Sequence, residues 1–168
     1  MPLGPCVERV REVFSYDPAT GELRWRRRPH PAAWKVIVGE IAGWMGSEGY
    51  REVQLDGASY KVHRLIWLYT TGIWPTHALD HRNGIRDDNR FENLRQATRT
   101  QNGQNQNHPH RHGSSGFLGV NRCNDGWQAR ITVEGKRRHL GTFHTPEEAH
   151  AVYVEAKREL HPFWVEGV

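Results

Sequence analysis

The sequence of 168 residues contains little cysteine and no long apolar segment. Cys6 and Cys123 are its two cysteines, which are too few for a disulfide framework or a cysteine-rich zinc site. No apolar run approaches the roughly 18 residues that a membrane-spanning helix needs. The first 30 residues carry four acidic side chains and lack the apolar core of a signal peptide. We therefore expect a soluble, cytoplasmic protein with no membrane partner and no structural zinc.

Positive charge exceeds negative charge only slightly, but its distribution is uneven. The 23 Lys and Arg residues and 19 Asp and Glu residues give a net charge of +4, with an isoelectric point of about 9.3. A value above 9 is typical of nucleic-acid-binding domains, although an ordinary basic protein can share it. Residues 111–138 hold six basic and two acidic side chains, whereas residues 139–168 hold two basic and five acidic ones. This segregation favours a surface directed at a polyanion.

The polar stretch at residues 105–116 divides the chain. Its sequence, NQNHPHRHGSSG, contains no apolar residue and predicts a linker. We therefore expect one domain over residues 1–104 and a second over residues 117–168. The alternating His108, His110 and His112 are interpreted as linker residues, with adventitious metal binding as the alternative.

Short helices and strands are predicted to alternate in the first domain. Apolar spacing predicts helices over residues 6–15 and 63–71, the second of which ends at Gly72. Asp56 and Gly57 are typical hairpin-turn residues. Strands are expected at residues 22–26, 36–42, 50–55 and 59–62.

The second domain is predicted to be a three-stranded antiparallel sheet with one packed helix. The strand-like runs are residues 117–121, 127–134 and 137–143, and turn residues separate them. Thr145 and Pro146 are typical of a helix start, and an apolar stripe follows them. The whole chain is therefore expected to be of the α+β class.

The densest polar cluster lies at residues 79–107. Asp80 and His81 follow an apolar pair, and a long polar loop separates them from Leu94. Thr98 then begins a pattern typical of a capped helix, which would carry Asn102. The order strand, long loop, strand, helix is predicted, with Asp80 and His81 on the first strand.

This spaced set resembles the HNH endonucleases with a ββα-metal fold, with its core motif at about residues 78–107. The matching residues are Asp80-His81, Asn93 within Glu-Asn-Leu, and Asn102 within Thr-Gln-Asn. The branch it resembles most is the phage and intron-encoded homing type. The resemblance implies a metal-dependent endonuclease that hydrolyses phosphodiester bonds in double-stranded DNA. A site-preferring nickase or homing endonuclease is expected, in a bacterium or a phage-infected host cell.

The resemblance also implies a role for each residue of the set. His81 would be the general base, because neutral imidazole, with a pKa of about 6.5, can take a proton from water. Asp80 and Asn102 would hold one divalent cation, and their oxygen atoms favour Mg²⁺, or Mn²⁺, over Zn²⁺. Asn93 would hydrogen-bond across the loop and hold the His81 strand. Arg90 is a candidate phosphate contact, with a solvated loop arginine as the alternative.

The second domain resembles the DNA-binding domain of plant ethylene-response factors, which also occurs in phage HNH nucleases. The similar text is GFLGVNR from residue 116, WQARITVEGKRRHLGTF from residue 127 and TPEEAHAVYVEA from residue 145. Strand alternation turns a polar, basic face away from the helix. The resemblance implies that this face enters the DNA major groove, with a solvated face as the alternative. The candidate DNA contacts on it are Asn121, Arg130, Thr132, Arg137 and His139.

Other functions fit parts of the sequence. A non-catalytic, sequence-specific DNA-binding regulator is the main alternative, although it does not explain the presence of the four motif residues. RNA binding is less favoured, because the sheet lacks the paired aromatic residues of single-strand RNA readers. His63 is interpreted as a structural histidine rather than a catalytic one. No protein partner is implied, and one visible active site makes a monomer the default expectation.

Overall fold

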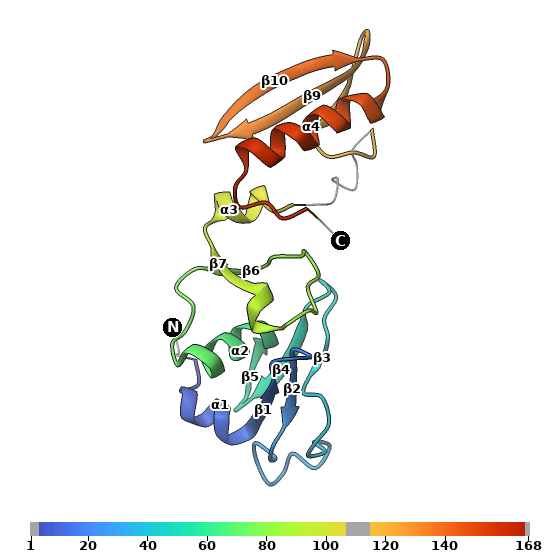
Figure 1. Ribbon diagram of the computed structural model, residues 1–168. Coiled ribbons are helices and arrows are strands. Elements are labelled where there is room, and N and C mark those ends of the chain that lie inside the picture. The colour runs from blue at the N-terminus through green and yellow to red at the C-terminus, as the bar shows by residue number, and fades with distance from the viewer. Residues whose placement is uncertain (1–3, 107–114, 167–168) are drawn as a thin grey trace. The chain divides into compact units, whose positions relative to one another are not determined.

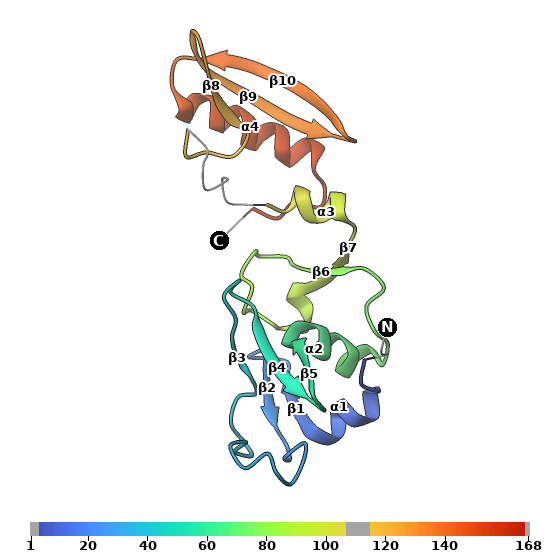
Figure 2. The same cartoon turned by 180° about the vertical axis from the view of Figure 1, so that it is seen from behind.

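The computed structural model describes residues 4–106 and 115–166. The chain forms two compact units, Met1–Arg99 and Thr100–Val168, and each is described by itself (Figure 1, Figure 2). Both contain small antiparallel sheets and helices, so the chain mixes α and β structure as expected. The three linker histidines lie outside the described residues. Within the described ranges, no helix is both long and apolar enough to cross a membrane.

The first unit opens with helix α1 (Val7–Val13) and the hairpin of β1 (Phe14–Asp17) and β2 (Glu22–Trp25). The helix predicted to reach residue 15 therefore ends at Val13, and β1 was not predicted. Phe14 adopts an extended backbone and pairs with Trp25, and its fully buried ring lies 4.8 Å from the Trp25 ring. This tertiary contact outweighs the helical spacing of the apolar residues.

A second sheet, ordered β3-β4-β5, contains β3 (Trp44–Met45), β4 (Arg51–Leu55) and β5 (Ala58–Lys61). Asp56 and Gly57 form a two-residue turn with positive φ angles, which confirms the predicted hairpin. The strand predicted over residues 36–42 is wrong. Only Ile41 in that range makes a bridge, to Arg24, because Gly39 and Gly43 interrupt the extended backbone with positive φ angles.

Helix α2 (Val62–Thr71) covers the core of this unit and ends at Gly72, as predicted. After it come β6 (Ala78–His81), the short 3₁₀ helix η1 (Phe91–Asn93) and β7 (Leu94–Ala97). Helix α3 (Arg99–Gln104) follows in the sequence, and from Thr100 onward it belongs to the second unit. This is the predicted order of strand, loop, strand and helix. Leu94 packs into the same core as Leu65, Ile66 and Val53, so the β6–β7 pair is anchored to it.

The second unit contains β8 (Val120–Cys123), β9 (Gly126–Val133), β10 (Lys136–Phe143) and α4 (Pro146–Leu160). The strands are ordered β10-β9-β8, and α4 lies along one sheet face (Figure 1, Figure 2). Thr145 caps α4 in a reciprocal pair of hydrogen bonds with Glu148. The first strand begins three residues later than predicted. Gly119 precedes it with a φ of 71°, and a Cβ there would lie 2.1 Å from the Tyr153 ring.

Candidate active site

The end of β6 carries the first two residues of the motif, Asp80 and His81, which are both buried. The antiparallel register places Asp80 opposite Arg95 and His81 opposite Leu94 of β7. Neighbouring residues of a strand point to opposite faces. Asp80 therefore shares a face with Arg95, while His81 shares the face on which Leu94 meets the core.

An arginine holds the Asp80 carboxylate. Arg95 donates from Nε to Asp80 Oδ2 at 3.0 Å, and its Nη2 lies 2.9 Å from the same oxygen. The two side chains are 10% and 12% exposed, so little water screens the pair. A charge-assisted contact of this kind fixes the orientation of the carboxylate.

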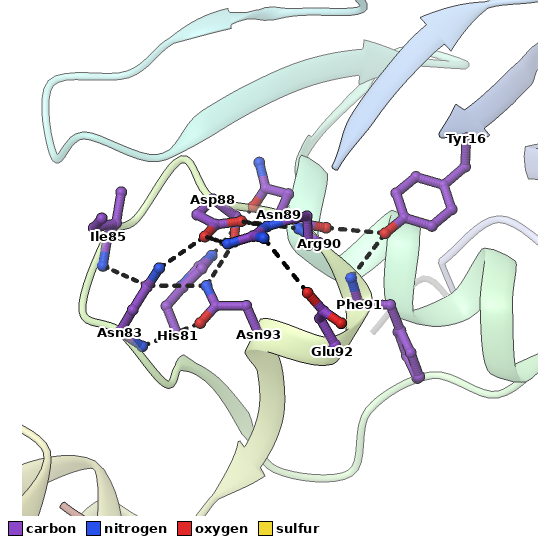
Figure 3. Close-up of polar contacts among 10 residues, drawn as sticks. All are labelled: Tyr16, His81, Asn83, Ile85, Asp88, Asn89, Arg90, Phe91, Glu92 and Asn93. Atoms are coloured by element: carbon purple, nitrogen blue, oxygen red, sulfur yellow. Dashed lines mark hydrogen bonds and ion pairs between the residues drawn. The ribbon is translucent and has the colours of Figure 1, made fainter. Parts of the chain in front are cut away.

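The His81 ring is enclosed by polar and aromatic neighbours. Its Nε2 lies 3.2 Å from Asn89 Oδ1 (Figure 3). The ring centroids of Tyr50 and His63 lie 5.8 Å and 5.2 Å from that of His81. Burial lowers the pKa of His81, while the hydrogen bond to Asn89 and the charge of Asp80 act in the opposite direction. Since the net shift is downward, the neutral imidazole predominates at neutral pH.

His63, on α2, also lies beside this site. It is 5% exposed, and its Nδ1 has no hydrogen-bond partner among the described residues. Its ring contacts Tyr50 at a centroid distance of 5.2 Å. Burial, followed by the charge of His81, lowers the pKa of His63 to about 3. The uncharged His63 ring therefore packs against the rings of Tyr50 and His81.

Asn93 bridges the loop between β6 and β7. Its Oδ1 accepts from the backbone N–H of Asn83 at 3.1 Å, and its Nδ2 donates to Asn83 Oδ1 and to the Asp88 carbonyl at 3.0 and 2.8 Å (Figure 3). The Asn93 carbonyl accepts from the N–H of Arg82 at 2.8 Å. These contacts tie the start of the loop, at Arg82 and Asn83, and its middle, at Asp88, to the one residue Asn93.

Arg90 is occupied by an acidic neighbour in the same loop. Its Nε and Nη2 donate to the two carboxylate oxygens of Asp88 at 2.8 and 2.6 Å. This bond, together with a hydrogen bond from Asn83, lowers the pKa of Asp88 to about 2. A phosphate contact from Arg90 would therefore compete with a bidentate ion pair.

Several partners of the site were not predicted from the sequence. Asn89 and Arg95 contact His81 and Asp80 directly, and both lie within the polar cluster. The Tyr16 hydroxyl donates to the Asn89 carbonyl at 3.3 Å and accepts from the N–H of Phe91 at 2.8 Å (Figure 3). The sequence offered one signal for Asn89, which is a further asparagine in the polar loop that follows His81. Tyr16 and Asn89 are 73 residues apart in the sequence, so no local pattern could predict their contact.

The residues present fit a hard divalent cation by their chemistry. Asp80, in the first unit, offers a carboxylate, whereas Asn102 is exposed on α3 and belongs to the second unit, so the structure does not bring the two together within one unit. Oxygen ligands of this kind suit Mg²⁺, which keeps several of its waters when protein ligands are few. In the described ranges, no group of three or more His, Cys, Asp and Glu residues is placed to hold a metal.

The predicted DNA-reading face lies on the second unit. The register places Arg137 opposite Thr132 and His139 opposite Arg130, so these four share one face of the sheet. Arg137, Thr132 and His139 are exposed, whereas Arg130 is half-buried. Asn121 pairs with Gln128 on the same face. The opposite face buries Val120, Ala129 and Ile131 under α4.

Residues 60–104 match a family model described as HNH endonuclease. The matched segment runs from the end of β5 through α2, β6 and β7 to α3, and it contains all four motif residues. No curated protein and no solved structure matches the chain. The chain carries an HNH endonuclease domain, and it is a nuclease that hydrolyses DNA. HNH nucleases generally use a divalent metal ion.

Proposed function

We propose that the chain is a metal-dependent endonuclease that cuts double-stranded DNA with a preference for particular sites. The observation that supports this most directly is the buried His81, whose Nε2 lies 3.2 Å from Asn89 Oδ1, on the strand that also carries Asp80. The resemblance to the homing-type branch favours a nicking enzyme or a homing endonuclease. A single visible active site favours a nicking monomer.

His81 has the properties that a general base needs. Because burial lowers its pKa, the ring is available at neutral pH to accept a proton from the attacking water. Asp80 and Asn102 would hold one Mg²⁺ or Mn²⁺ ion. When bound, that ion supplies charge stabilisation at the phosphate and the leaving oxygen. Asn93 keeps the loop, and with it the strand end, in place.

The second unit would supply affinity and sequence choice. The exposed Arg137, Thr132 and His139 form a polar face that carries no part of the core of that unit. A small antiparallel sheet fits the major groove of DNA. Its resemblance to a plant DNA-binding domain supports this assignment, while differences at positions filled by arginine in the plant proteins argue against the same target sequence.

A plasmid assay tests the proposal. Supercoiled DNA is incubated with Mg²⁺, with Mn²⁺ or with a chelator, and wild type is compared with His81→Ala. Loss of a general base slows a reaction by about 10²–10⁴-fold, so nicking by the variant should fall at least a hundredfold. The exposed His77, which lies just before β6, provides a matched His77→Ala control that should nick like wild type.

Three results would contradict parts of this proposal. Equal nicking by His81→Ala and wild type would show that His81 is not the general base. Full activity in the presence of the chelator would show that cleavage needs no metal ion. Tight DNA binding with no cleavage under any of the cations would favour the DNA-binding regulator instead.

A further inference from the structure

The β2–β3 loop (residues 26–43) combines positive charge with exposed apolar side chains. Its residues 26–39 include four basic residues and no acidic one. The loop lies at the end of the first unit opposite β6 and β7 (Figure 1, Figure 2). We propose that the β2–β3 loop is a further binding site for double-stranded DNA, which it contacts beside the cleaved bond rather than at it. This inference rests on the proposed function, since the ligand is the DNA that the enzyme cuts.

Three large apolar side chains of the loop are exposed to solvent. Trp34, Ile37 and Val38 are 71%, 64% and 56% exposed. A group of this kind on the surface marks an interaction site, because removing it from water is favourable. Proteins that bind the minor groove of DNA insert apolar side chains at base steps and place cations beside them. The β2–β3 loop offers both kinds of side chain.

The cations next to these side chains are available to phosphate. Arg28 donates from Nε to the Val36 carbonyl at 3.2 Å, and the Lys35 ammonium lies 5.2 Å from the centre of the Trp34 ring. Both side chains are exposed. Their contacts are with a carbonyl group and a ring, so among the described residues no carboxylate neutralises their charge.

Arg27 differs from its neighbour Arg28 in this respect. Its guanidinium forms an ion pair with the carboxylate of Glu12, which also pairs with Arg9. A phosphate would have to compete with Glu12 for Arg27. The two adjacent arginines therefore provide a matched comparison between a paired and an unpaired cation.

Backbone hydrogen bonds hold the loop in one shape. At its base, the Gly39 N–H donates to the Trp25 carbonyl at 2.7 Å, and the Trp25 N–H donates to the Glu40 carbonyl at 3.0 Å. Closer to the exposed side chains, the Val36 N–H donates to the Ala33 carbonyl at 3.0 Å. A surface that is already formed loses less conformational entropy when it binds a partner.

The charge of the loop favours DNA over a second copy of this chain. The whole chain has a net charge of +4, so another copy would be repelled by a basic loop. Duplex DNA carries one negative charge per about 1.7 Å of its axis, and each cation that contacts a phosphate releases a counterion. DNA therefore matches the charge of the loop, and its groove can accept the apolar side chains.

Binding to a labelled duplex of random sequence tests the cations. Full-length proteins carry His81→Ala so that the DNA stays intact, and affinity is measured over a series of salt concentrations. Arg28→Ala and Lys35→Ala should each lower the slope of log affinity against log salt by about one. Arg27→Ala removes the same charge and should leave the slope unchanged.

The same assay tests the apolar side chains. Trp34→Ala should weaken binding about tenfold with the salt slope unchanged, because it removes apolar burial and no phosphate contact. Ile73→Ala is the matched control, since Ile73 is 69% exposed but lies after α2, outside the loop. It should bind DNA like the parent protein. Thermal unfolding of each variant verifies that it is folded.

The outcomes separate this inference from the proposed function. Parent-like DNA binding by Arg28→Ala, Lys35→Ala and Trp34→Ala overturns the inference, whether or not wild type cuts DNA. Equal changes of slope in Arg27→Ala and Arg28→Ala also overturn it, since diffuse positive charge would then explain them. A dimer that Trp34→Ala dissociates without changing DNA affinity would make the loop a self-association surface instead. If the expected differences appear but wild type cuts no DNA with any cation, the DNA site stands and the proposed endonuclease function fails.

Discussion

Individual polar residues around His81 form a closed network rather than a set of independent ligands. Asn93 holds the loop, Asn89 faces His81, and Arg95 orients Asp80. Asp80, His81 and Asn93 were singled out by their resemblance to a spaced motif, because the motif occupies one stretch of sequence. Their partners could not all be predicted. The pairing of Asp80 with Arg95 depends on strand register, and the Tyr16 contact depends on the packing of a distant hairpin.

Asn93→Ala tests the loop bridge at the level of one side chain. The substitution removes three hydrogen bonds and leaves the Asn83 N–H and the Asp88 carbonyl without their partner. A partly buried polar group left unpaired costs about 1–3 kcal/mol, so we expect a loss of about 2 kcal/mol in unfolding free energy. Denaturant titration measures it. The exposed Gln54→Ala should change stability by less than about 0.5 kcal/mol, and an equal loss there would contradict the assignment.

The buried His63 predicts a pH-dependent stability. Its pKa of about 3 in the folded chain lies below the usual 6.5, so the unfolded chain binds more protons between these values. Stability is therefore fully present above about pH 6.5 and falls as the pH is lowered toward 3. The slope from this residue approaches about 1.4 kcal/mol per pH unit.

His63→Phe isolates this contribution. The variant should lose less stability than wild type between pH 6.5 and pH 4, as measured by thermal or denaturant unfolding. Measurement at pH 7.5 separates the effect of packing from that of titration. Identical pH slopes for the two proteins would show that His63 is accessible to protons in the folded state.

Elements with strong local signals were predicted well, and elements that depend on tertiary contacts were not. The turn at Asp56-Gly57 and the start of α4 at Thr145 are encoded in a few adjacent residues. Strand β1 is not, because its apolar spacing also suits a helix and its pairing with β2 decides the outcome. The same reason explains the late start of β8, where Gly119 lies against Tyr153. The β1–β2 hairpin matters for function because Gly21 and Tyr16 support the site loop.

Gly21→Ala tests this support. Gly21 has a φ of 77°, and an added Cβ would lie 2.5 Å from the Arg90 nitrogen and 2.7 Å from the Asn89 carbonyl carbon. Because both atoms belong to the backbone, the loop must move. We expect a loss of about 3 kcal/mol in stability and reduced cleavage, since about 1–2 kcal/mol comes from the left-handed backbone alone.

Gly57→Ala is the matched control for the backbone term. Gly57 has a φ of 83° in a turn with nothing within 4 Å of the added Cβ. The Gly57→Ala variant should therefore lose only about 1–2 kcal/mol of unfolding free energy, and its cleavage should be unchanged while the protein remains folded. Equal losses of cleavage in the two variants would mean that the hairpin does not support the loop.

On the scale of the whole chain, the proposed catalytic residues and the proposed DNA-binding face lie mostly in different parts of the sequence. The family match covers residues 60–104, while the excess of basic residues lies at 111–138. Counts of charged residues were enough to predict this uneven distribution of charge. The acidic residues that offset the basic segment lie mostly on α4. Strand alternation was also sufficient to predict which residues lie on each face of the second sheet, because successive side chains of a strand point to opposite faces.

Arg137 and Arg138 test whether the face of the sheet, rather than its net charge, binds DNA. Both are exposed and adjacent, but Arg137 pairs with Thr132 on the polar face, whereas Arg138 pairs with Ile131 on the face that α4 covers. DNA affinity is measured over a series of salt concentrations, in the His81→Ala background so that the DNA stays intact. Arg137→Ala should lower the salt slope by about one and weaken binding roughly tenfold at 0.1 M salt. Arg138→Ala carries the same change of charge and should have a smaller effect. Equal effects would indicate a nonspecific basic surface, and no effect of either would place the DNA contacts elsewhere.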